Sequence, residues 1–179
     1  MGDATRFDPS PLIDRMDTFA RTLPAAVGGI TAAEARWKPD DASWSIVEIV
    51  AHLADEETED FRARVRNTLE DPARAWAPID PEGWASERRY LDRKLSDELT
   101  RFAVARAESL AWLRSLPADA PWTNTREHPT AGPLSAGDLL ASWCAHDALH
   151  LRQIAKRLYQ LTQRDAGAFK TEYAGDWTA

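Results

Sequence analysis

Hydrophobic residues recur at three- and four-residue spacing along four long stretches of the chain, a spacing typical of amphipathic α-helices. The stretches cover residues 9–27, 45–69, 86–116 and 135–163. No stretch shows the sustained alternation of hydrophobic and polar residues that is typical of a half-buried β-strand. The pattern therefore predicts an all-α protein with four long helices.

Short polar signals mark the starts of two of these helices. Ser45 is followed three residues later by Glu48, and Ser135 is followed in the same way by Asp138. In each pair the hydroxyl can accept a hydrogen bond from the first turn, while the acid can bond back to the serine backbone. Both pairs therefore predict a capped helix N-terminus.

The segments between the predicted helices are rich in proline and tryptophan. Residues 71–84 contain three prolines and two tryptophans, and residues 117–133 contain four prolines and one tryptophan. Because proline interrupts helices, we expect both segments to be irregular loops, and a loop with aromatic side chains often borders a pocket. Helices and loops of these lengths predict a four-helix bundle, in a single domain that spans residues 1–179.

Composition and charge narrow the classes of partner. The chain has 179 residues, a formal net charge of −7 and a pI of about 5.1, and these values oppose a surface that neutralises nucleic-acid phosphates. The N-terminus lacks the apolar core of a signal peptide, and no stretch reaches the roughly 20 apolar residues that cross a bilayer. The single cysteine, Cys144, fits a reducing compartment. We expect a cytoplasmic protein that binds neither nucleic acid nor a membrane.

The most informative chemical feature is a pair of histidines in the last predicted helix. His146 and His150 interrupt an otherwise hydrophobic row, and residues four apart lie on one helix face about 6 Å apart along the axis. His52 lies at the edge of the hydrophobic stripe of the second predicted helix. If the two helices pack together, three imidazoles can bind one cation, and three nitrogens with an open fourth position describe a catalytic zinc site.

Other residues near the histidines are candidates for supporting roles. Glu56 follows His52 by one helical turn, with Asp55 beside it. An acid there could orient His52, supply a weak fourth ligand or act as a general base, and the spacing alone does not choose between these roles. Trp143 lies about one turn before His146, so we expect it to form a substrate-binding wall of the pocket.

Each of these features also has a plain structural interpretation. A His-x-x-x-His pair arises by chance in helices, and the three histidines could be hydrogen-bonded core residues. The acidic run at residues 55–60 is typical of a solvated face, and His128 of a surface loop. We interpret Cys144 as a small buried hydrophobe, since it points about 160° around the helix from His146.

Two segments resemble motifs of the DinB/YfiT-like proteins of the DinB superfamily. Residues 44–55 read WSIVEIVAHLAD and resemble the motif of the second helix of these proteins. Residues 146–154 read HDALHLRQI and resemble the motif of the last helix, including a glutamine just past the second histidine. The resemblance spans nearly the whole chain.

This resemblance implies a four-helix bundle of the up-down-down-up type, in many members a homodimer, with three histidines that hold zinc, nickel or another divalent ion. The implied ligands are His52, His146 and His150. Relatives include S-transferases that use bacillithiol, mycothiol or glutathione, a mycothiol-dependent maleylpyruvate isomerase and proposed hydrolases. The resemblance therefore implies a small-molecule substrate and, for a transferase, a low-molecular-weight thiol as cosubstrate.

Three hypotheses follow from the sequence. The leading one is an enzyme, an S-transferase or hydrolase, in which the ion lowers the pKa of a water or a thiol and yields a nucleophile near neutral pH. The second is a non-catalytic metal-binding or stress-responsive bundle, in which the ion cross-links two helices and the tail, residues 164–179, mediates dimerisation. The third is an interaction module without metal, in which the histidines belong to the core.

Overall fold

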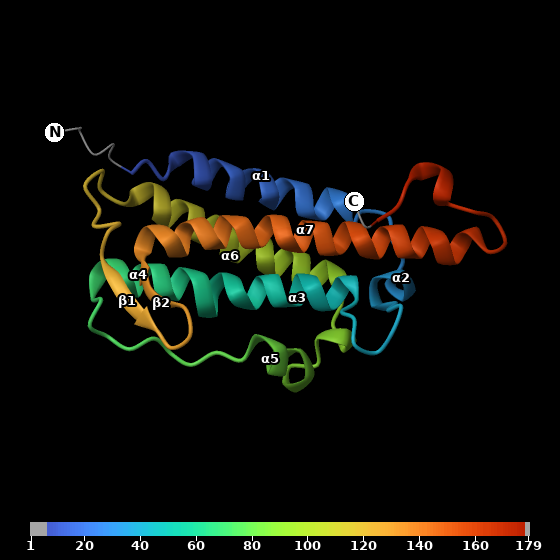
Figure 1. The fold of residues 1–179 in the computed structure, drawn as a ribbon, viewed down its shortest axis with the longest axis horizontal. Coiled ribbons are helices and arrows are strands. Elements are labelled where there is room, and N and C mark those ends of the chain that lie inside the picture. The colour runs from blue at the N-terminus through green and yellow to red at the C-terminus, as the bar shows by residue number, and fades with distance from the viewer. Residues whose placement is uncertain (1–6, 178–179) are drawn as a thin grey trace.

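Four long helices lie side by side in the structure, a computed structural model that describes residues 7–177 (Figure 1). They are α1 (Ser10–Ala26), the rod formed by α3 (Ile46–Glu56), the π-helical turn η1 (Glu57–Phe61) and α4 (Arg62–Glu70), then α6 (Leu95–Ser115) and α7 (Ala136–Ala166). Shorter elements occupy the connections and the tail: α2 (Ala32–Arg36), α5 (Pro81–Glu87), η2 (Tyr90–Asp92) and η3 (Glu172–Ala174). The predicted four-helix bundle is confirmed.

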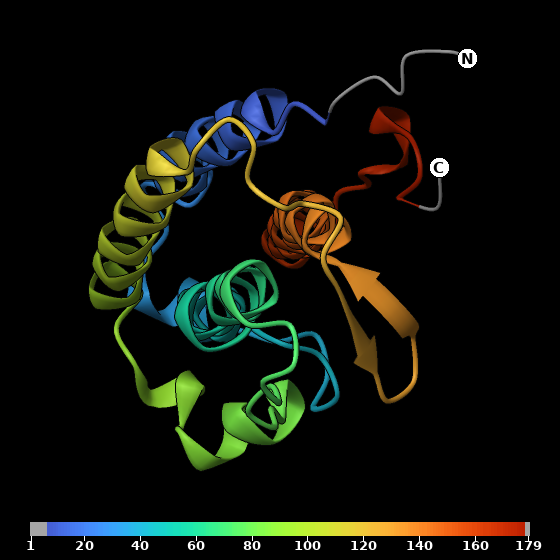
Figure 2. The ribbon, with the colours of Figure 1, turned by 90° about the vertical axis from the view of Figure 1, so that its left-hand side faces the viewer.

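The helix directions follow the expected up-down-down-up order. Helices α1 and α7 run in one direction along the bundle, and the α3–α4 rod and α6 run in the other (Figure 1). Because the rod and α6 run the same way, residues 71–94 must return along the length of the bundle between them. Figure 2 shows this return segment, with α5, covering the outer side of the rod, where α5 and η2 contact α3.

The predicted caps are present at the starts of α3 and α7. The Ser45 backbone N–H donates to Glu48 Oε2 at 2.7 Å, and the Glu48 N–H donates back to Ser45 Oγ. Ser135 and Asp138 form the same reciprocal pair, with distances of 2.9 and 3.0 Å. These capping boxes fix where the two histidine-bearing helices begin.

The apolar core is divided into two halves along the bundle. One half gathers the start of α1, α4, the end of α6 and the start of α7; the other gathers the end of α1, α3, the start of α6 and the later part of α7. The largest buried apolar side chains include Met16, Trp143 and Leu140 in the first half and Phe102, Ile49 and Ile154 in the second. The buried polar residues described below lie between the halves.

The third long helix differs from the sequence prediction at its start. The predicted helix at residues 86–116 begins only at Leu95, because the preceding residues form the end of α5, a left-handed turn at Arg89 (φ 51°) and η2. Leu91 fits the helical spacing, yet it is 36% exposed. The helical spacing of hydrophobic residues thus continues by coincidence into the return segment. Helix α5 begins within residues 71–84, which the sequence predicts as an irregular loop.

A short antiparallel hairpin occupies the predicted loop before α7. Strand β1 (Thr125–His128) pairs with β2 (Gly132–Ser135), and Gly132 adopts φ +75° at the turn. The expectation of an irregular loop was wrong here, since Pro133 interrupts the usual pattern of strand residues. Figure 2 shows the hairpin projecting beside α7.

The C-terminal tail folds back onto the last helix. The Trp177 ring lies 5.6 Å from that of Tyr159 in α7, whereas Phe169 and Tyr173 are exposed. Residues 1–6, where the sequence shows no signal-peptide core, and the last two tail residues lie outside the described part of the chain. Across residues 7–177, no helix has the length and apolar character that a bilayer crossing requires.

Candidate metal centre

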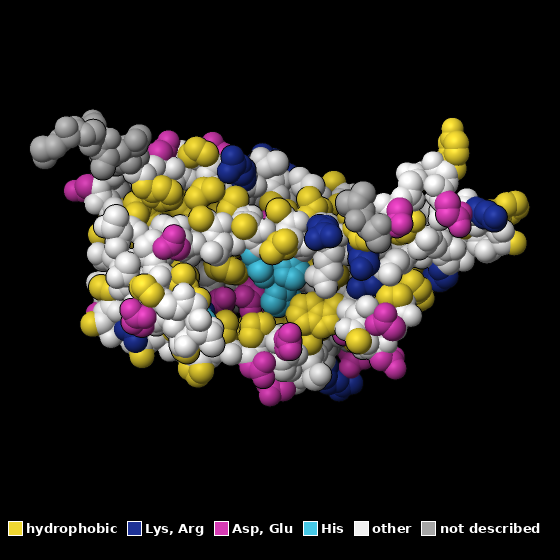
Figure 3. Space-filling view, in the orientation of Figure 1, with side chains coloured by type: hydrophobic (Ala, Val, Ile, Leu, Met, Phe, Trp, Pro, Cys, Tyr) yellow, Lys and Arg dark blue, Asp and Glu magenta, His cyan; other side chains and the backbone are white. Residues whose placement is uncertain are grey.

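Three histidines from two helices converge at the middle of the bundle. The Nε2 atom of His146 lies 3.3 Å from His52 Nε2 and 2.9 Å from His150 Nε2. One ring nitrogen from each residue falls within a group whose members all lie within 4.8 Å of one another. Figure 3 shows the histidine side chains together in a hollow on the face of the molecule formed by α3 and α7, with acidic side chains beside them.

The local sequence places each of these side chains. His52 lies in the second turn of α3, whose start is fixed by the Ser45 cap, and it is 5% exposed. His146 and His150 lie one turn apart on α7, so their rings project from the same helix face. Since α3 packs against α7, the three rings come from opposite walls of one site.

Burial keeps all three imidazoles neutral. It lowers the pKa of His52 from 6.5 to about 3 and that of His146 to about 2, with a further contribution in each case from the neighbouring His150. The pKa of His150 is also lowered by burial. Neutral imidazole is the form that ligates a metal ion, so the rings are ready to bind one at neutral pH.

The hydrogen bonds of the rings explain why a cation fits between them. Gln153 Oε1 lies 2.8 Å from His150 Nδ1 and can only accept, so this nitrogen carries the proton and His150 Nε2 presents a lone pair. In a neutral ring the Nε2 of His146 offers either one proton or one lone pair, so it cannot bond to both neighbours. A cation among the three Nε2 atoms removes this conflict.

The pKa directions predict a simple titration of the metal-free protein. We expect the ring protons of His52 and His146 to keep the NMR shifts of neutral imidazole down to about pH 5, well below the ordinary histidine pKa of about 6.5. The folded protein keeps these rings neutral, whereas the unfolded chain protonates them below its pKa of about 6.5. The stability of the folded state is therefore unaffected by these rings above pH 6.5, and it falls as the pH drops toward the folded pKa values of about 3 for His52 and about 2 for His146. Titration of these rings near pH 6.5 in the folded protein would show that the site is open to water.

Aromatic rings border the histidines, but not the one that the sequence suggested. The ring of Trp44 lies 4.9 Å from that of His52, and the ring of Phe61 lies 5.0 Å from that of His146. Trp143 stacks behind Phe61 at 6.0 Å and is 1% exposed. The aromatic neighbours of the site are therefore Trp44 and Phe61, and contact between Trp143 and a substrate stays a prediction.

The acids after His52 do not orient its ring. Within the described residues, His52 Nδ1 is buried and has no hydrogen-bond partner, so neither Glu56 nor Asp55 accepts a hydrogen bond from it, and of the roles that the spacing left open this one is not seen. Glu56 is also outside the group of mutually close candidate ligand atoms. It is 4% exposed, and burial, with the nearby Asp60, raises its pKa to about 9. Burial beside Asp60 therefore favours the protonated form of Glu56.

Asp55 instead attaches the return segment to the bundle. Its Oδ2 accepts from Tyr90 Oη at 2.5 Å and from Arg88 at 2.6 Å, and Arg101 of α6 donates to Oδ1. Burial opposes ionisation of Asp55, but the hydrogen bonds from Tyr90 and the two arginines hold its pKa below the usual value. Its role in the structure is to join three segments of the chain.

A buried polar layer crosses the bundle beside the histidines. Arg106 of α6 donates to both oxygens of Glu57 at 2.8 Å and to both oxygens of Asp147 at 2.6 and 2.9 Å. It also donates to the Met16 carbonyl, and the Trp143 indole N–H donates to Glu57 at 3.0 Å. Burial nevertheless raises the pKa of Asp147 to about 6. The layer holds α1, η1, α6 and α7 together directly next to His146.

The acidic run at residues 55–60, interpreted from its pattern as a solvated face, is largely buried in the structure, so that interpretation is wrong. Four of its acids are less than 9% exposed: Asp55, Glu56, Glu57 and Asp60. The run coincides with the π-helical turn η1, and such turns occur mainly at functional sites. The arginines that bond to Asp55 and Glu57 lie on distant parts of the chain, so spacing along one helix could not reveal them.

The remaining candidates behave as expected. Cys144 packs against the core, where burial raises the pKa of its thiol, and it does not belong to the group of close candidate ligands. His128 Nδ1 accepts from the backbone N–H groups of Thr130 and Ala131, which stabilises the turn of the hairpin. Both residues have structural roles.

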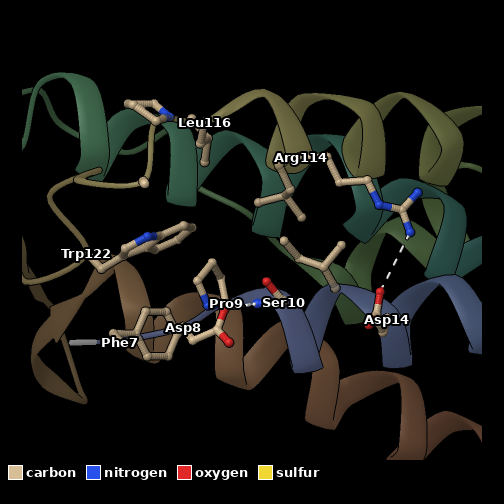
Figure 4. A pocket seen from close by; sticks show the side chains of 12 residues that line it. Phe7, Asp8, Pro9, Ser10, Asp14, Arg114, Leu116 and Trp122 are labelled. Carbon is tan, nitrogen blue, oxygen red and sulfur yellow. Dashed lines mark hydrogen bonds and ion pairs between the residues drawn. The ribbon is translucent and has the colours of Figure 1, made fainter. Parts of the chain in front are cut away.

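Two cavities differ in their relation to the histidines. A cavity of about 460 Å³ lies where the start of α1 meets the end of α6, and its lining contains no histidine or cysteine (Figure 4). Another, of about 510 Å³, is lined by Trp44 and Gln153, which contact His52 and His150, respectively. Neither lining contains a histidine, but Trp44 and Gln153 of the second cavity contact the histidines, so the second cavity lies beside the candidate metal centre.

Comparisons with known proteins identify the family of the chain and a solved structure with a similar fold. The family model described as the DinB superfamily matches residues 15–154, a range that contains all three histidines. Among solved structures, the chain is similar to YfiT from Bacillus subtilis, with a TM-score of 0.77 and 19% identity over 90% of this chain and 94% of that chain. YfiT is described as "a probable metal-dependent hydrolase with an unusual four-helix bundle topology". No curated protein matches the chain.

Proposed function

The chain belongs to the DinB superfamily, and from that premise we propose that it is a metal-dependent enzyme whose divalent ion is held by His52, His146 and His150. Zinc or nickel is the ion that suits three imidazoles. The reaction that we propose is hydrolysis of a small molecule or transfer of a low-molecular-weight thiol to an electrophile. The description of YfiT as a "probable metal-dependent hydrolase" supports the first of these.

The observation that carries the proposal is the convergence of three Nε2 atoms. Ligand nitrogens at 2.0 to 2.1 Å from a tetrahedral ion lie about 3.3 Å from one another. The distances of 3.3 Å and 2.9 Å between the Nε2 atoms match this spacing to within about 0.4 Å. Packing of neutral imidazoles alone gives no reason for all three to point the same nitrogen at one place.

The donor set suggests what the site can do. A divalent ion held by three protein ligands supplies a Lewis acid that lowers the pKa of a water or thiol to near neutrality. The half-buried Trp44 and Phe61 rings limit the access of bulk water to the histidines. Glu56, protonated and with its Oε1 lacking a hydrogen-bond partner among the described residues, is proposed as the general acid that gives a proton to the leaving group.

Replacing Glu56 with glutamine tests this role. We expect kcat to fall by about 10²- to 10⁴-fold, because the amide has no acidic proton to give, while metal content stays unchanged. The raised pKa also predicts that the wild-type protein loses stability as the pH rises from 4.5 to about 9, and that the variant loses less. Kinetics and urea unfolding at both ends of this range measure the two effects.

The exposed neighbour Glu59 offers a matched control for that substitution. Its carboxylate bonds to Arg88 at the surface, so Glu59→Gln should leave kcat and the pH dependence of stability nearly unchanged. Equal losses of kcat in the two variants would exclude Glu56 as the proton donor.

The function itself is tested with zinc-loaded and chelator-treated protein. We expect hydrolysis of esters or amides, or conjugation of small thiols to electrophiles, that disappears on chelation and returns with zinc. If the protein binds metal but neither hydrolyses the esters and amides nor conjugates the thiols, the result would instead favour the non-catalytic metal-binding bundle. A homodimer stays a prediction that light scattering of the full chain can check.

A further inference from the structure

A buried arginine lies beyond the histidines on the same helix without an acidic partner. Arg157 is 4% exposed, and across residues 7–177 no carboxylate forms an ion pair with it. Its Nη1 donates to Gln160, while its Nε is buried and has no hydrogen-bond partner. Arg106, the other fully buried arginine, has two carboxylates. A buried guanidinium without an ion-paired carboxylate is costly, so a bound anion would stabilise this one.

Arg157 lines the cavity that lies beside the candidate metal centre. The lining of this cavity of about 510 Å³ consists of Ala42, Ser43, Trp44, Glu82, Gln153 and Arg157. Gln153 and Trp44 connect it to the site, because the first contacts His150 Nδ1 and the ring of the second lies 4.9 Å from that of His52. A molecule in this cavity therefore contacts the residues that surround the histidines.

The helix geometry places the guanidinium at a fixed distance from the histidines. Residues 150, 153 and 157 follow one another at three- and four-residue spacing on α7, so they share one face. Seven residues correspond to about 10 Å along the axis, which sets the scale of the separation between His150 and Arg157. This separation suits a small molecule with an anionic group at one end and a reacting group at the other.

Basic side chains lie near this cavity, and the acids around Arg157 leave it without an ion pair. The chain carries a net charge of −7, yet a neighbouring cavity that shares Gln153 is lined by Arg152 and Lys156. Figure 3 shows Lys and Arg side chains beside the histidine patch on this face. The acids that act on Arg157 through space are Asp40 and Glu48, and Glu82 lies exposed in the cavity lining. None of these acids makes an ion pair with it.

We propose that the cavity at Arg157 binds the carboxylate group of the small molecule that reacts at the histidine centre. The planar guanidinium presents parallel N–H donors that match a carboxylate in a bidentate pair. The proposal deepens the proposed function, on which it rests, by naming the substrate class: a carboxylate-bearing thiol or a carboxylate-bearing electrophile. Gln153 and Trp44 form the wall between the carboxylate and the reacting end.

Two matched pairs of probes test the proposal on the full-length protein. The first compares 3-mercaptopropionate with 3-mercapto-1-propanol, and the second compares succinate with 1,4-butanediol. We expect the wild-type protein to bind at least one of the two carboxylates about tenfold more tightly than the matching alcohol. This is the difference in affinity expected when one charge-assisted bidentate hydrogen-bond pair is gained. NMR titration gives the dissociation constants, and the pair with the larger preference identifies whether thiol or electrophile carries the carboxylate.

Substitutions assign the preference to the cavity. Arg157→Met should remove it, Arg157→Lys should keep part of it, and Glu82→Gln should increase it, because an opposing charge is lost. Arg114→Met, at the other end of the bundle in an exposed ion pair with Asp17, should leave it unchanged. Equal binding of carboxylate and alcohol by the wild-type protein, or a preference that survives Arg157→Met, overturns the proposal.

The outcome is separable from that of the proposed function. Metal content, measured on the same samples, reports on the histidines, and it should be the same in the wild-type protein and in Arg157→Met. The succinate pair is also titrated into chelator-treated protein, where a preference that depends on Arg157 supports the carboxylate subsite even if no metal binds. If neither the metal-loaded nor the chelator-treated wild-type protein prefers the carboxylate to the alcohol, the result counts against the subsite and leaves the metal centre untouched.

Discussion

Replacing Arg106 with methionine should destabilise the folded protein by about 3–5 kcal/mol, the largest effect that we expect from one substitution. The side chain is 1% exposed and compensates the carboxylates of Glu57 and Asp147, which are themselves nearly inaccessible to water. Without the guanidinium, two acids face each other in the core, and each must take up a proton or remain unpaired. Urea unfolding at pH 7 measures the change.

Two further variants keep this prediction testable if Arg106→Met does not fold. Glu57→Gln retains the shape of the acid and leaves Arg106 its bonds to Asp147, so a smaller loss is expected. Arg114→Met removes an exposed arginine from the same helix and should cost less than about 1 kcal/mol. If Arg106→Met and Arg114→Met lost the same stability, the buried layer would not hold the bundle together.

Replacing His150 with alanine should abolish tight metal binding and with it any turnover. Loss of a residue that only supports a metal ligand weakens metal binding by roughly 10- to 100-fold. His150→Ala removes one of the three ligands themselves, so the affinity for zinc should fall further than this. The variant should still fold, since His150 is only partly buried. Titration with zinc in competition with a chelator measures the affinity.

Gln153→Ala provides the graded comparison for this prediction. Gln153 bonds to His150 Nδ1 and fixes which nitrogen presents its lone pair, but it does not reach the other two rings. Its loss should weaken zinc binding by about 10- to 100-fold and leave the stoichiometry at one ion per chain. Wild-type affinity in His150→Ala would contradict the proposed ligand set.

Local signals explain why the helices that carry the histidines were predictable. The capping pairs at Ser45 and Ser135 define the starts of α3 and α7, and the hydrophobic spacing then determines which face is buried. The convergence of His52 on His146 needed only that these two faces pack together. In this region, sequence and structure agree because local signals place each helix and its buried face, and a single packing contact between α3 and α7 then brings the histidines together.

The buried polar layer around Arg106 and the cavity at Arg157 are formed instead by residues that lie far apart in the sequence. Glu57 meets an arginine 49 positions away, and Asp55 meets one 46 positions away, so nothing in the acidic run itself indicates burial. The π-helical turn η1 shifts the helix register and is not encoded by a recognisable pattern. The sequence likewise does not distinguish Arg157 from other arginines, because its burial without an ion-paired acid depends on the tertiary structure.

The return segment shows the same limit for the fold. Leu91 and Leu95 continue the helical spacing of α6, yet the chain before Leu95 must turn to follow the outside of α3. Asp55 directs it there by bonding to Tyr90 and Arg88. Periodicity alone cannot distinguish a helix from a segment held in place by tertiary hydrogen bonds.

Elemental analysis of the untagged, full-length protein shows whether His52, His146 and His150 hold a metal ion. After incubation with zinc and exhaustive dialysis, we expect one ion per chain in the wild-type protein and none in His150→Ala. Wild-type protein without bound metal, or a His150→Ala variant that retains a full equivalent, would contradict this expectation.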